Sequence, residues 1–249
     1  MERVSHARRS GGMAMVRWDR WACVVLAAGA SIARGEVIVS RPARADPALV
    51  GQGYFSHSEP RQTRNFKHAD QFSISTSARV ESVAWWGISE GVASDDLANF
   101  DEFTIELFES VTADTGNPRP GTRIAQERFS MAQTAPTPTG RRAPAPDNAI
   151  EYRHHATLAT PVQLDADKTY FIAISARSIL PRGDGWKWRD TELVDGYSVS
   201  YSYASGQWLE LIDTDSAFEL HGVVPAPASA VPLIGLGCAA SARRRPSAP

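Results

Sequence analysis

Apolar and polar residues alternate along most of residues 68–222. Gln71–Ser75, Phe103–Phe108 and Thr169–Ser175 each place an apolar residue at every second position. This period of two residues predicts β-strands that bury one face. We therefore expect these segments to contribute alternate side chains to a common core.

One predicted strand, at residues 80–87, is apolar on both sides. Val83 and Trp85 would lie on one face, and Val80 and Trp86 on the other. This pattern predicts a strand that is buried on both faces.

Further strands are predicted at Arg123–Met131, Tyr152–Leu158, Tyr197–Tyr203 and Gln207–Ile212, and residues 35–40 form either an early strand or only a leader. The dipeptide Ser205-Gly206 predicts a tight hairpin between the last two strands. Residues 134–147, rich in Pro, Thr and Ala, predict an exposed loop.

Nearly every periodic segment is a strand, and no predicted helix is long enough for a parallel crossover. The pattern predicts an all-β fold, an antiparallel β-sandwich that is jelly-roll-like, with an immunoglobulin-like sandwich as the alternative. We expect a signal peptide at 1–35, a leader or linker at 36–67, the sandwich at 68–222 and a sorting tail at 223–249.

The amino-terminal segment has the order of a secretory signal peptide. Five arginines precede the apolar run Trp21–Ala30, and small residues follow at Ala33 and Gly35, where signal peptidase could cut before Glu36. Arginines flank both terminal apolar segments of the chain, so the positive-inside rule keeps both ends cytoplasmic and places the body outside.

The last 26 residues begin with Val224-Pro225-Ala226-Pro227, continue through an uncharged segment at 228–242 and carry Arg243-Arg244-Arg245 near the end. A helix of about 15 residues spans roughly 22 Å, less than a stable bilayer span, which suits a transient membrane anchor. This tail resembles the PEP-CTERM sorting signal of exopolysaccharide-producing bacteria, with Ala226 where the motif has Glu. The alternative is a disordered Ala/Pro-rich terminus with a basic end.

The resemblance implies that an exosortase, a membrane-embedded cysteine transpeptidase, cuts near the motif and passes the body to the cell surface. We therefore expect a secreted protein of the cell envelope or extracellular space. Its partners during export would be signal peptidase and exosortase.

Short pieces of the body stand in a definite order: His68-Ala69-Asp70-Gln71-Phe72, Val83-Ala84-Trp85-Trp86-Gly87, Phe103-Thr104-Ile105, Pro120-Gly121, Tyr152, Thr160-Pro161-Val162, Thr169–Ile174, Trp186-Lys187-Trp188 and Ser216–Leu220. In this order they resemble the bodies of proteins that carry PEP-CTERM tails. The resemblance implies an extracellular β-sandwich whose biochemical role is unassigned.

Processing at both ends would change the charge of the protein. Removing residues 1–35 and 228–249 takes away nine basic and two acidic groups, which leaves 17 basic against 26 acidic groups, a net charge of −9. An acidic body without a basic stripe excludes nucleic acid as a partner.

Cys23 and Cys238 lie in the two terminal segments, so the body has no thiol for a disulfide or a zinc cluster.

Gly87-Ile88-Ser89-Glu90-Gly91 matches the G-x-S-x-G nucleophile elbow, in which a strained turn from strand to helix exposes the serine of a hydrolase. A hairpin loop with Gly and Ser explains the match as well, because the residues that follow lead to another strand. A secreted serine hydrolase acting through Ser89 is the enzymatic alternative.

Two acidic clusters, Asp95, Asp96 and Asp101 with Glu102, and Asp213 with Asp215, could supply oxygen ligands for a structural calcium ion. Neither follows the EF-hand pattern, and solvated loop charge is the alternative. No other cofactor is expected.

Tryptophans supply the best indication of binding in the body: Trp85, Trp86, Trp186, Trp188 and Trp208. Exposed indoles can stack on sugar rings, whereas core packing is the alternative use of the same residues. In a strand, Trp186 and Trp188 would share one face and Lys187 would take the other.

These patterns together favour a non-enzymatic, exported protein associated with surface polysaccharide or extracellular matrix. A carbohydrate-binding module that uses exposed tryptophans is the second hypothesis.

Overall fold

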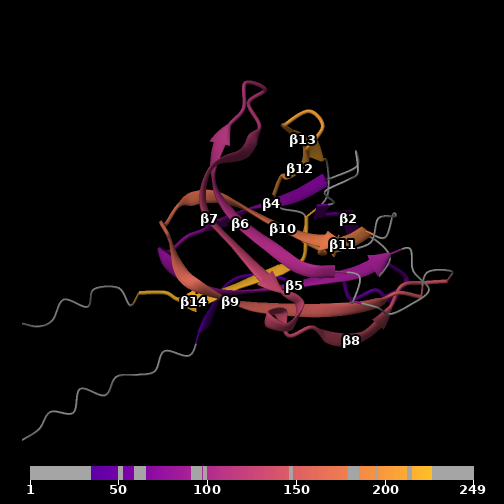
Figure 1. Cartoon of the computed structure of the whole chain (residues 1–249). Coiled ribbons are helices and arrows are strands. Elements are labelled where there is room, and N and C mark those ends of the chain that lie inside the picture. The colour runs from indigo at the N-terminus through magenta and orange to yellow at the C-terminus, as the bar shows by residue number, and fades with distance from the viewer. Residues whose placement is uncertain are drawn as a thin grey trace, which may run out of the picture. The chain divides into compact units, whose positions relative to one another are not determined.

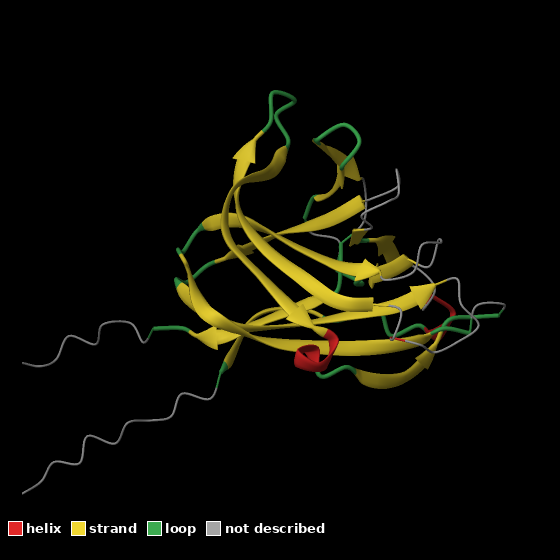
Figure 2. Cartoon of the chain, in the orientation of Figure 1, coloured by secondary structure: helices red, strands yellow, loops and turns green. Residues whose placement is uncertain are grey.

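The computed structural model describes residues 35–49, 53–58, 66–90, 97, 100–145, 148–178, 185–193, 196–211 and 215–225. All of them fall within one unit, Ala33–Pro249. Two sheets pack face to face, and the described residues include two short 3₁₀ turns, η1 (Pro47–Leu49) and η3 (Met131–Thr134) (Figures 1 and 2). The predicted all-β sandwich is confirmed.

The first sheet has seven strands: β1 (Glu36–Arg41), β2 (Gly53–Phe55), β5 (Ala78–Glu90), β8 (Thr137–Arg142), β9 (Ile150–Leu164), β11 (Gly185–Arg189) and β14 (Phe218–Val223). The long strand β5 lies at the centre. It pairs with β9 along one edge and with both β14 and β11 along the other edge. β1 adds to β14, β2 to β11 and β8 to β9.

The second sheet also has seven strands: β3 (His57–Ser58), β4 (Phe66–Ile74), β6 (Phe100–Thr112), β7 (Pro118–Ser130), β10 (Lys168–Ser178), β12 (Ser198–Ser202) and β13 (Gln207–Leu211). Their order is β13-β12-β4-β10-β6-β7, with the short β3 beside β10 and β4. The described pairings are antiparallel except for β3 with β10.

Alternation along the strands builds the main core between the two sheets. The predicted inward sides are confirmed for Phe103, Ile105 and Leu107 of β6 and for Tyr170, Ile172 and Ile174 of β10, all of which are buried in this core. Each such side chain contributes about 1.5–3 kcal/mol through burial. Trp186 and Trp188 also share the core face of β11, as predicted, while Lys187 lies on the other side over Phe55.

The prediction for Val80 is wrong. It packs in the same core as Val83 and Trp85, whereas Trp86 contacts Ala43 on the outer face of the sheet. Val80 pairs with Gly222 of β14 and Ser82 with His221, so Glu81 is an extra residue on β5, and such a bulge reverses the alternation of side chains.

Two further predictions need correction. Residues 134–147 are not wholly a loop, because β8 lies there and pairs with β9. The early strand, one of the two readings of residues 35–40, is confirmed as β1, which pairs with β14; with β2, which pairs with β11, it shows that the sandwich begins earlier than residue 68. These segments escaped prediction because β2 is only three residues long and β8 carries Pro, Gly and two arginines in place of an apolar alternation.

Successive strands cross repeatedly between the sheets, from β4 to β5, β5 to β6, β7 to β8 and β9 to β10. The second sheet is also strongly curled. Trp208 of β13 packs edge to face against Phe108 of β6 at 5.8 Å, although three long strands separate β13 from β6. The outer face of this sheet is therefore concave.

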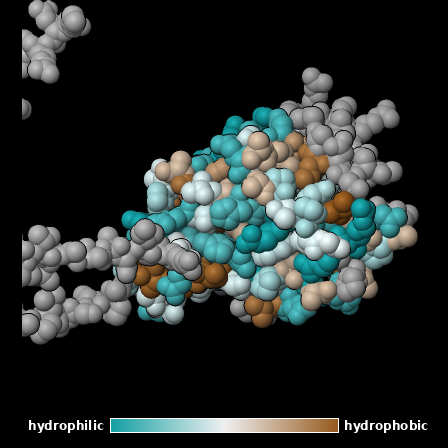
Figure 3. Space-filling model, turned by 90° about the horizontal axis from the view of Figure 1, so that it is seen from below, coloured by the Kyte–Doolittle hydropathy of each residue, from teal (hydrophilic) through white to brown (hydrophobic). Residues whose placement is uncertain are grey.

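Both ends of the described chain lie at one edge of the first sheet. Glu36 at the start of β1 pairs with Gly222 near the end of β14. In Figure 3 the face seen from below is mainly hydrophilic or neutral, with small separate hydrophobic areas. Within the described residues no helix has the length and apolar character needed to cross a membrane.

Candidate functional site

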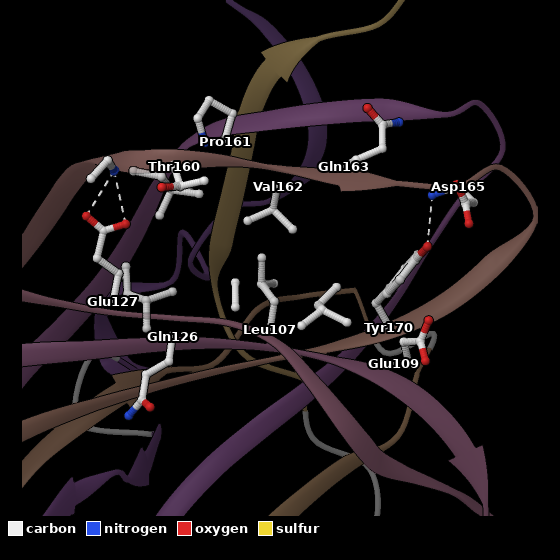
Figure 4. Close-up of a pocket in the computed structure, with 15 residues that line it drawn as sticks. Leu107, Glu109, Gln126, Glu127, Thr160, Pro161, Val162, Gln163, Asp165 and Tyr170 are labelled. Carbon is white, nitrogen blue, oxygen red and sulfur yellow. Dashed lines mark hydrogen bonds between the residues drawn. The ribbon is translucent and has the colours of Figure 1, made fainter.

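A groove of about 580 Å³ opens between β7 and β9, and we call it the edge groove (Figure 4). Among the described strands β7 pairs only with β6, and β8 covers β9 only near residues 150–153. Both β7 and β9 therefore present an open edge to the other described strands here. The floor of the groove is apolar and continuous with the main core; it includes Ile105, Leu107, Leu158, Val162 and Tyr170.

A second bulge, in the pairing of β9 with β5, lies at the part of β9 that lines the groove. Val80 pairs with Val162 and Ser82 with Thr157, so residues 158–161 of β9 have only one residue of β5 opposite them. The carboxylate of Glu127 spans the groove, and its two oxygens accept the Ala159 N–H at 2.9 and 3.0 Å. At the other end of the groove, the hydroxyl of Tyr170 accepts the Asp165 N–H at 2.8 Å (Figure 4).

The rim of the edge groove is acidic and amide-rich, with Glu109, Gln126, Glu127, Gln163 and Asp165. The described residues that line it include no histidine, cysteine or serine. An apolar floor with carboxylate and amide groups at the rim suits the binding of a ligand.

A second hollow, of about 420 Å³, lies between the β6–β7 and β12–β13 hairpins, and we call it the hairpin hollow. Its lining combines Trp208 and Gln207 of β13 with Arg119, Pro120 and Gly121 of β7. The curl of the second sheet brings these two hairpins together. The predicted β12–β13 hairpin is confirmed, and its turn uses Gly206 at φ 69°, a conformation that favours glycine.

Aromatic rings surround a lysine beneath the hairpin hollow. The Lys67 ammonium lies 5.4 Å from the ring centroids of both Tyr201 and Trp208 and 5.5 Å from that of Phe108. It also forms a 2.5 Å ion pair with Glu106, whose other oxygen accepts from Arg123 at 2.9 Å. Two cations around one buried carboxylate leave this cluster with a net positive charge.

Four of the five predicted glycan-binding tryptophans cannot act as exposed platforms. Trp85, Trp186 and Trp188 are fully buried in the main core, and Trp86 is 7% exposed beneath the Arg153 guanidinium. Core packing, the other use weighed for these residues, is therefore confirmed for these four, because strand alternation directs three of them between the sheets. Trp208 alone among the five is partly exposed.

Ser89 does not occupy a nucleophile elbow. It lies inside β5, paired with Trp186 of β11, and among the described residues its buried hydroxyl has no hydrogen-bond partner. The glycine of the motif has a packing role, because a Cβ on Gly87 would lie 2.2 Å from the Trp186 indole nitrogen. In this G-x-S-x-G match, Gly87 therefore leaves space on β5 for the indole of Trp186.

The predicted calcium ligands are not brought together where they are described. Asp101 pairs with Arg177, which lowers the pKa of the Asp101 carboxyl, whereas Asp215 is buried near Arg41 at 3.6 Å. No group of three or more potential metal ligands occurs within the described ranges. Asp95, Asp96 and Asp213 lie outside those ranges.

The sorting motif is described only at Val224 and Pro225, which follow β14; Val224 packs against the main core. Ala226, Pro227 and the three arginines lie outside the described residues, as does the signal-peptide segment before Gly35.

A buried ion pair links β1 of the first sheet to β4 of the second sheet. Arg41 at the end of β1 pairs with Asp70 of β4 at 3.3 Å, and Asp70 also accepts the Ser216 N–H. Burial raises the pKa of Asp70 well above its ordinary value, although Arg41 opposes this.

Burial lowers the pKa of both His68 and His154 to about 3, so the two imidazoles are neutral near pH 7.

Sequence reasoning missed Lys67, Phe108 and Arg119 as neighbours of Trp208. They come from three other strands, β4, β6 and β7, and only the curl of the sheet brings them to β13. The available signals were Pro120-Gly121, which lies within β7 beside the β6–β7 turn, and Gly206 in the β12–β13 turn.

Comparisons with known proteins place the chain in one family. The family described as "Domain of unknown function (DUF7901)" matches residues 41–221. No curated protein matches the chain.

Two solved structures of a CocE/NonD family hydrolase from Staphylococcus aureus show a distant likeness. One has 9% identity and a TM-score of 0.33 over 77% of this chain and 37% of the hydrolase, and the other has 10% identity and a TM-score of 0.28 over 76% and 41%. The chain spans less than half the length of that hydrolase, and a likeness at this level carries no argument about function.

Proposed function

Because this chain belongs to the DUF7901 family, described as a domain of unknown function, we propose its role from its own residues. It is an exported, non-enzymatic protein of the cell surface or extracellular matrix. A PEP-CTERM-type tail and an exosortase deliver it, and a signal peptide starts its export.

The pairing of β1 with β14 carries this proposal. Glu36 and Gly222 are direct partners, so the segments that precede and follow the sandwich leave it from the same edge of one sheet. A chain held in a membrane at both ends needs those ends on one side of the folded body. Adjacent ends meet this need without opening the sandwich, and cleavage at both would leave all described strands in place.

Composition supports the same destination. The two cysteines of the chain, Cys23 and Cys238, lie in the segments that processing would remove. The sandwich can therefore fold in an oxidising compartment without disulfide exchange.

The surroundings of Ser89 support a non-enzymatic role. An acyl-transfer serine needs a base within hydrogen-bond reach and space for a substrate, whereas Ser89 is 8% exposed within β5. Both hollows described above suit binding.

Fractionation of native-host cells tests the proposed delivery. Two antibodies, one against the sandwich and one against residues 228–249, would follow body and tail separately. We expect the body outside the cell without the tail, and a tail-retaining form in membranes of cells that lack exosortase activity. Intact, tail-retaining protein in the cytoplasm of normal cells would overturn the proposal.

Substituting the basic end provides a matched control. Alanine at Arg243, Arg244 and Arg245 should impair delivery, whereas lysine at the same positions keeps the positive charge and should impair it much less. Equal delivery of the alanine and wild-type forms would contradict a role for the arginines in sorting.

Carbohydrate binding is a second candidate function, favoured by the partly exposed Trp208 at the hairpin hollow and by exposed Tyr197 and Tyr203 on and beside the β12–β13 hairpin. Exposed aromatic rings with a polar rim suit stacking on sugars. A glycan array would compare the wild-type protein with Trp208→Ala and with Leu209→Ala, an adjacent exposed residue, as the control. Identical binding by all three proteins would exclude Trp208 as the platform.

A further inference from the structure

We infer that the hairpin hollow binds an anionic saccharide, with Trp208 stacking on the sugar ring and Arg119 pairing with a carboxylate of a uronate residue. This inference rests on the proposed association with surface polysaccharide and names the chemistry of that partner.

The aromatic component is held in place before any ligand arrives. The ring of Trp208 contacts Tyr201 at 5.1 Å and Phe108 at 5.8 Å, both edge to face, and Lys67 lies over it. A side chain already fixed by its neighbours loses little further conformational freedom when a ligand stacks on it. Trp208 nevertheless remains partly exposed and lines the hollow.

The charge around the hollow selects for an anion. Within the described part of the chain Arg119 has no ion-pair partner, and it is an exposed residue of the lining. Lys67, which lies over the Trp208 ring, shares the single carboxylate of Glu106 with Arg123. This positive region belongs to a body whose net charge between residues 36 and 227 is −9, so the local charge is opposite to that of the body.

The groups present fit a saccharide better than other anions. A guanidinium pairs with a carboxylate through two parallel hydrogen bonds, and the amide of Gln207 can both donate to and accept from sugar hydroxyls. Nucleic acid would require several cations in a row to neutralise successive phosphates, and the lining offers one. The volume of about 420 Å³ admits one or two sugar rings.

Titration calorimetry with the purified full-length chain tests the inference. The probes are oligogalacturonate, an uncharged dextran oligosaccharide and sulfated dextran, at low and at physiological salt. We expect oligogalacturonate to bind at least tenfold more tightly than uncharged dextran, with weaker binding at higher salt. Equal affinity for the charged and uncharged sugars, or binding to sulfated dextran alone, would overturn it.

Matched variants locate the site. Trp208→Ala and Arg119→Ala should each weaken oligogalacturonate binding about tenfold or more, and Arg119→Lys should restore only part of it. Arg128→Ala on the same strand, near Glu102, and Leu209→Ala should change binding less than twofold. Equal losses with Arg119→Ala and Arg128→Ala would show non-specific attraction and contradict the site.

Unfolding curves for every variant separate loss of the site from loss of the fold. The calorimetry needs no export, so a negative result here leaves the delivery proposal standing. Retention of the tail in the cytoplasm would instead refute delivery while leaving the binding result unaffected.

Discussion

The indole of Trp208 meets the ring of Phe108 edge to face at 5.8 Å, across a sheet in which three long strands lie between them. Trp186 packs against Phe103 at a similar 5.1 Å, but it does so inside the main core, where it is fully buried. The same residue type therefore has two roles here, one in stability and one at a surface hollow.

This difference predicts two distinct costs of truncation. Trp186→Ala should lower the free energy of unfolding by about 3–5 kcal/mol, because it leaves a large cavity between the sheets. Trp208→Ala should lower it by about 1 kcal/mol, since the ring is partly exposed. Urea unfolding measures both, and equal losses would contradict the assignment of Trp208 to the surface.

Gly87 and Ser89 distinguish a packing role of the G-x-S-x-G motif from a catalytic one. Gly87→Ala should destabilise the protein by about 3 kcal/mol, because the new methyl group would overlap the Trp186 indole. Ser89→Ala should change the free energy of unfolding by less than about 0.5 kcal/mol or increase it, since none of the described residues forms a hydrogen bond with the buried hydroxyl. Thermal unfolding of the two variants is the measurement, and a neutral Gly87→Ala would refute the packing role.

The buried imidazoles predict acid sensitivity. The folded-state pKa of His68 and His154, about 3, lies below the ordinary value of 6.5, so the unfolded chain binds protons that the folded chain does not. The stability that the two neutral imidazoles contribute should therefore be fully present above about pH 6.5. This contribution to the free energy of unfolding should fall as the pH drops from 6.5 toward 3, with a slope of up to about 1.4 kcal/mol per pH unit for each histidine. Asp70 acts in the opposite sense, because its raised pKa favours the folded state at lower pH.

A substitution isolates one histidine. His154→Phe should reduce the dependence of the unfolding free energy on pH between 6.5 and 3, because the ring at this position stacks on Trp85 and needs no charge. His221→Gln on the partly exposed side of β14 is the control. An unchanged pH slope in His154→Phe would show that this imidazole does not resist protonation.

Glu127 predicts a local effect at the edge groove. Glu127→Ala frees the Ala159 N–H and should cost about 1 kcal/mol of stability, limited by solvent access to the rim. Hydrogen exchange of the Ala159 amide should accelerate, while exchange in β5 stays slow. Gln126→Ala is the control, and unchanged exchange at Ala159 in Glu127→Ala would contradict the bridge.

Local alternation was sufficient to predict the long strands, because side chains at every second position of β4, β6 and β10 enter one core. It failed at Val80, where the bulge reverses the alternation, and at β8, where pairing with β9 overrides a sequence of weak strand residues. Trp208 was identified from its residue type alone. Arg119 and Lys67 could not be, since their proximity to Trp208 depends on the curl of the whole sheet.

Mass spectrometry of the surface-exposed protein from its native host tests the proposed delivery most directly, because it gives both mature ends. We predict a chain that begins near Glu36 and ends near Pro227, which would leave β1 and β14 paired at the edge of the first sheet. A surface-exposed product that still carries Arg243, Arg244 and Arg245, or the segment before Glu36, would contradict it.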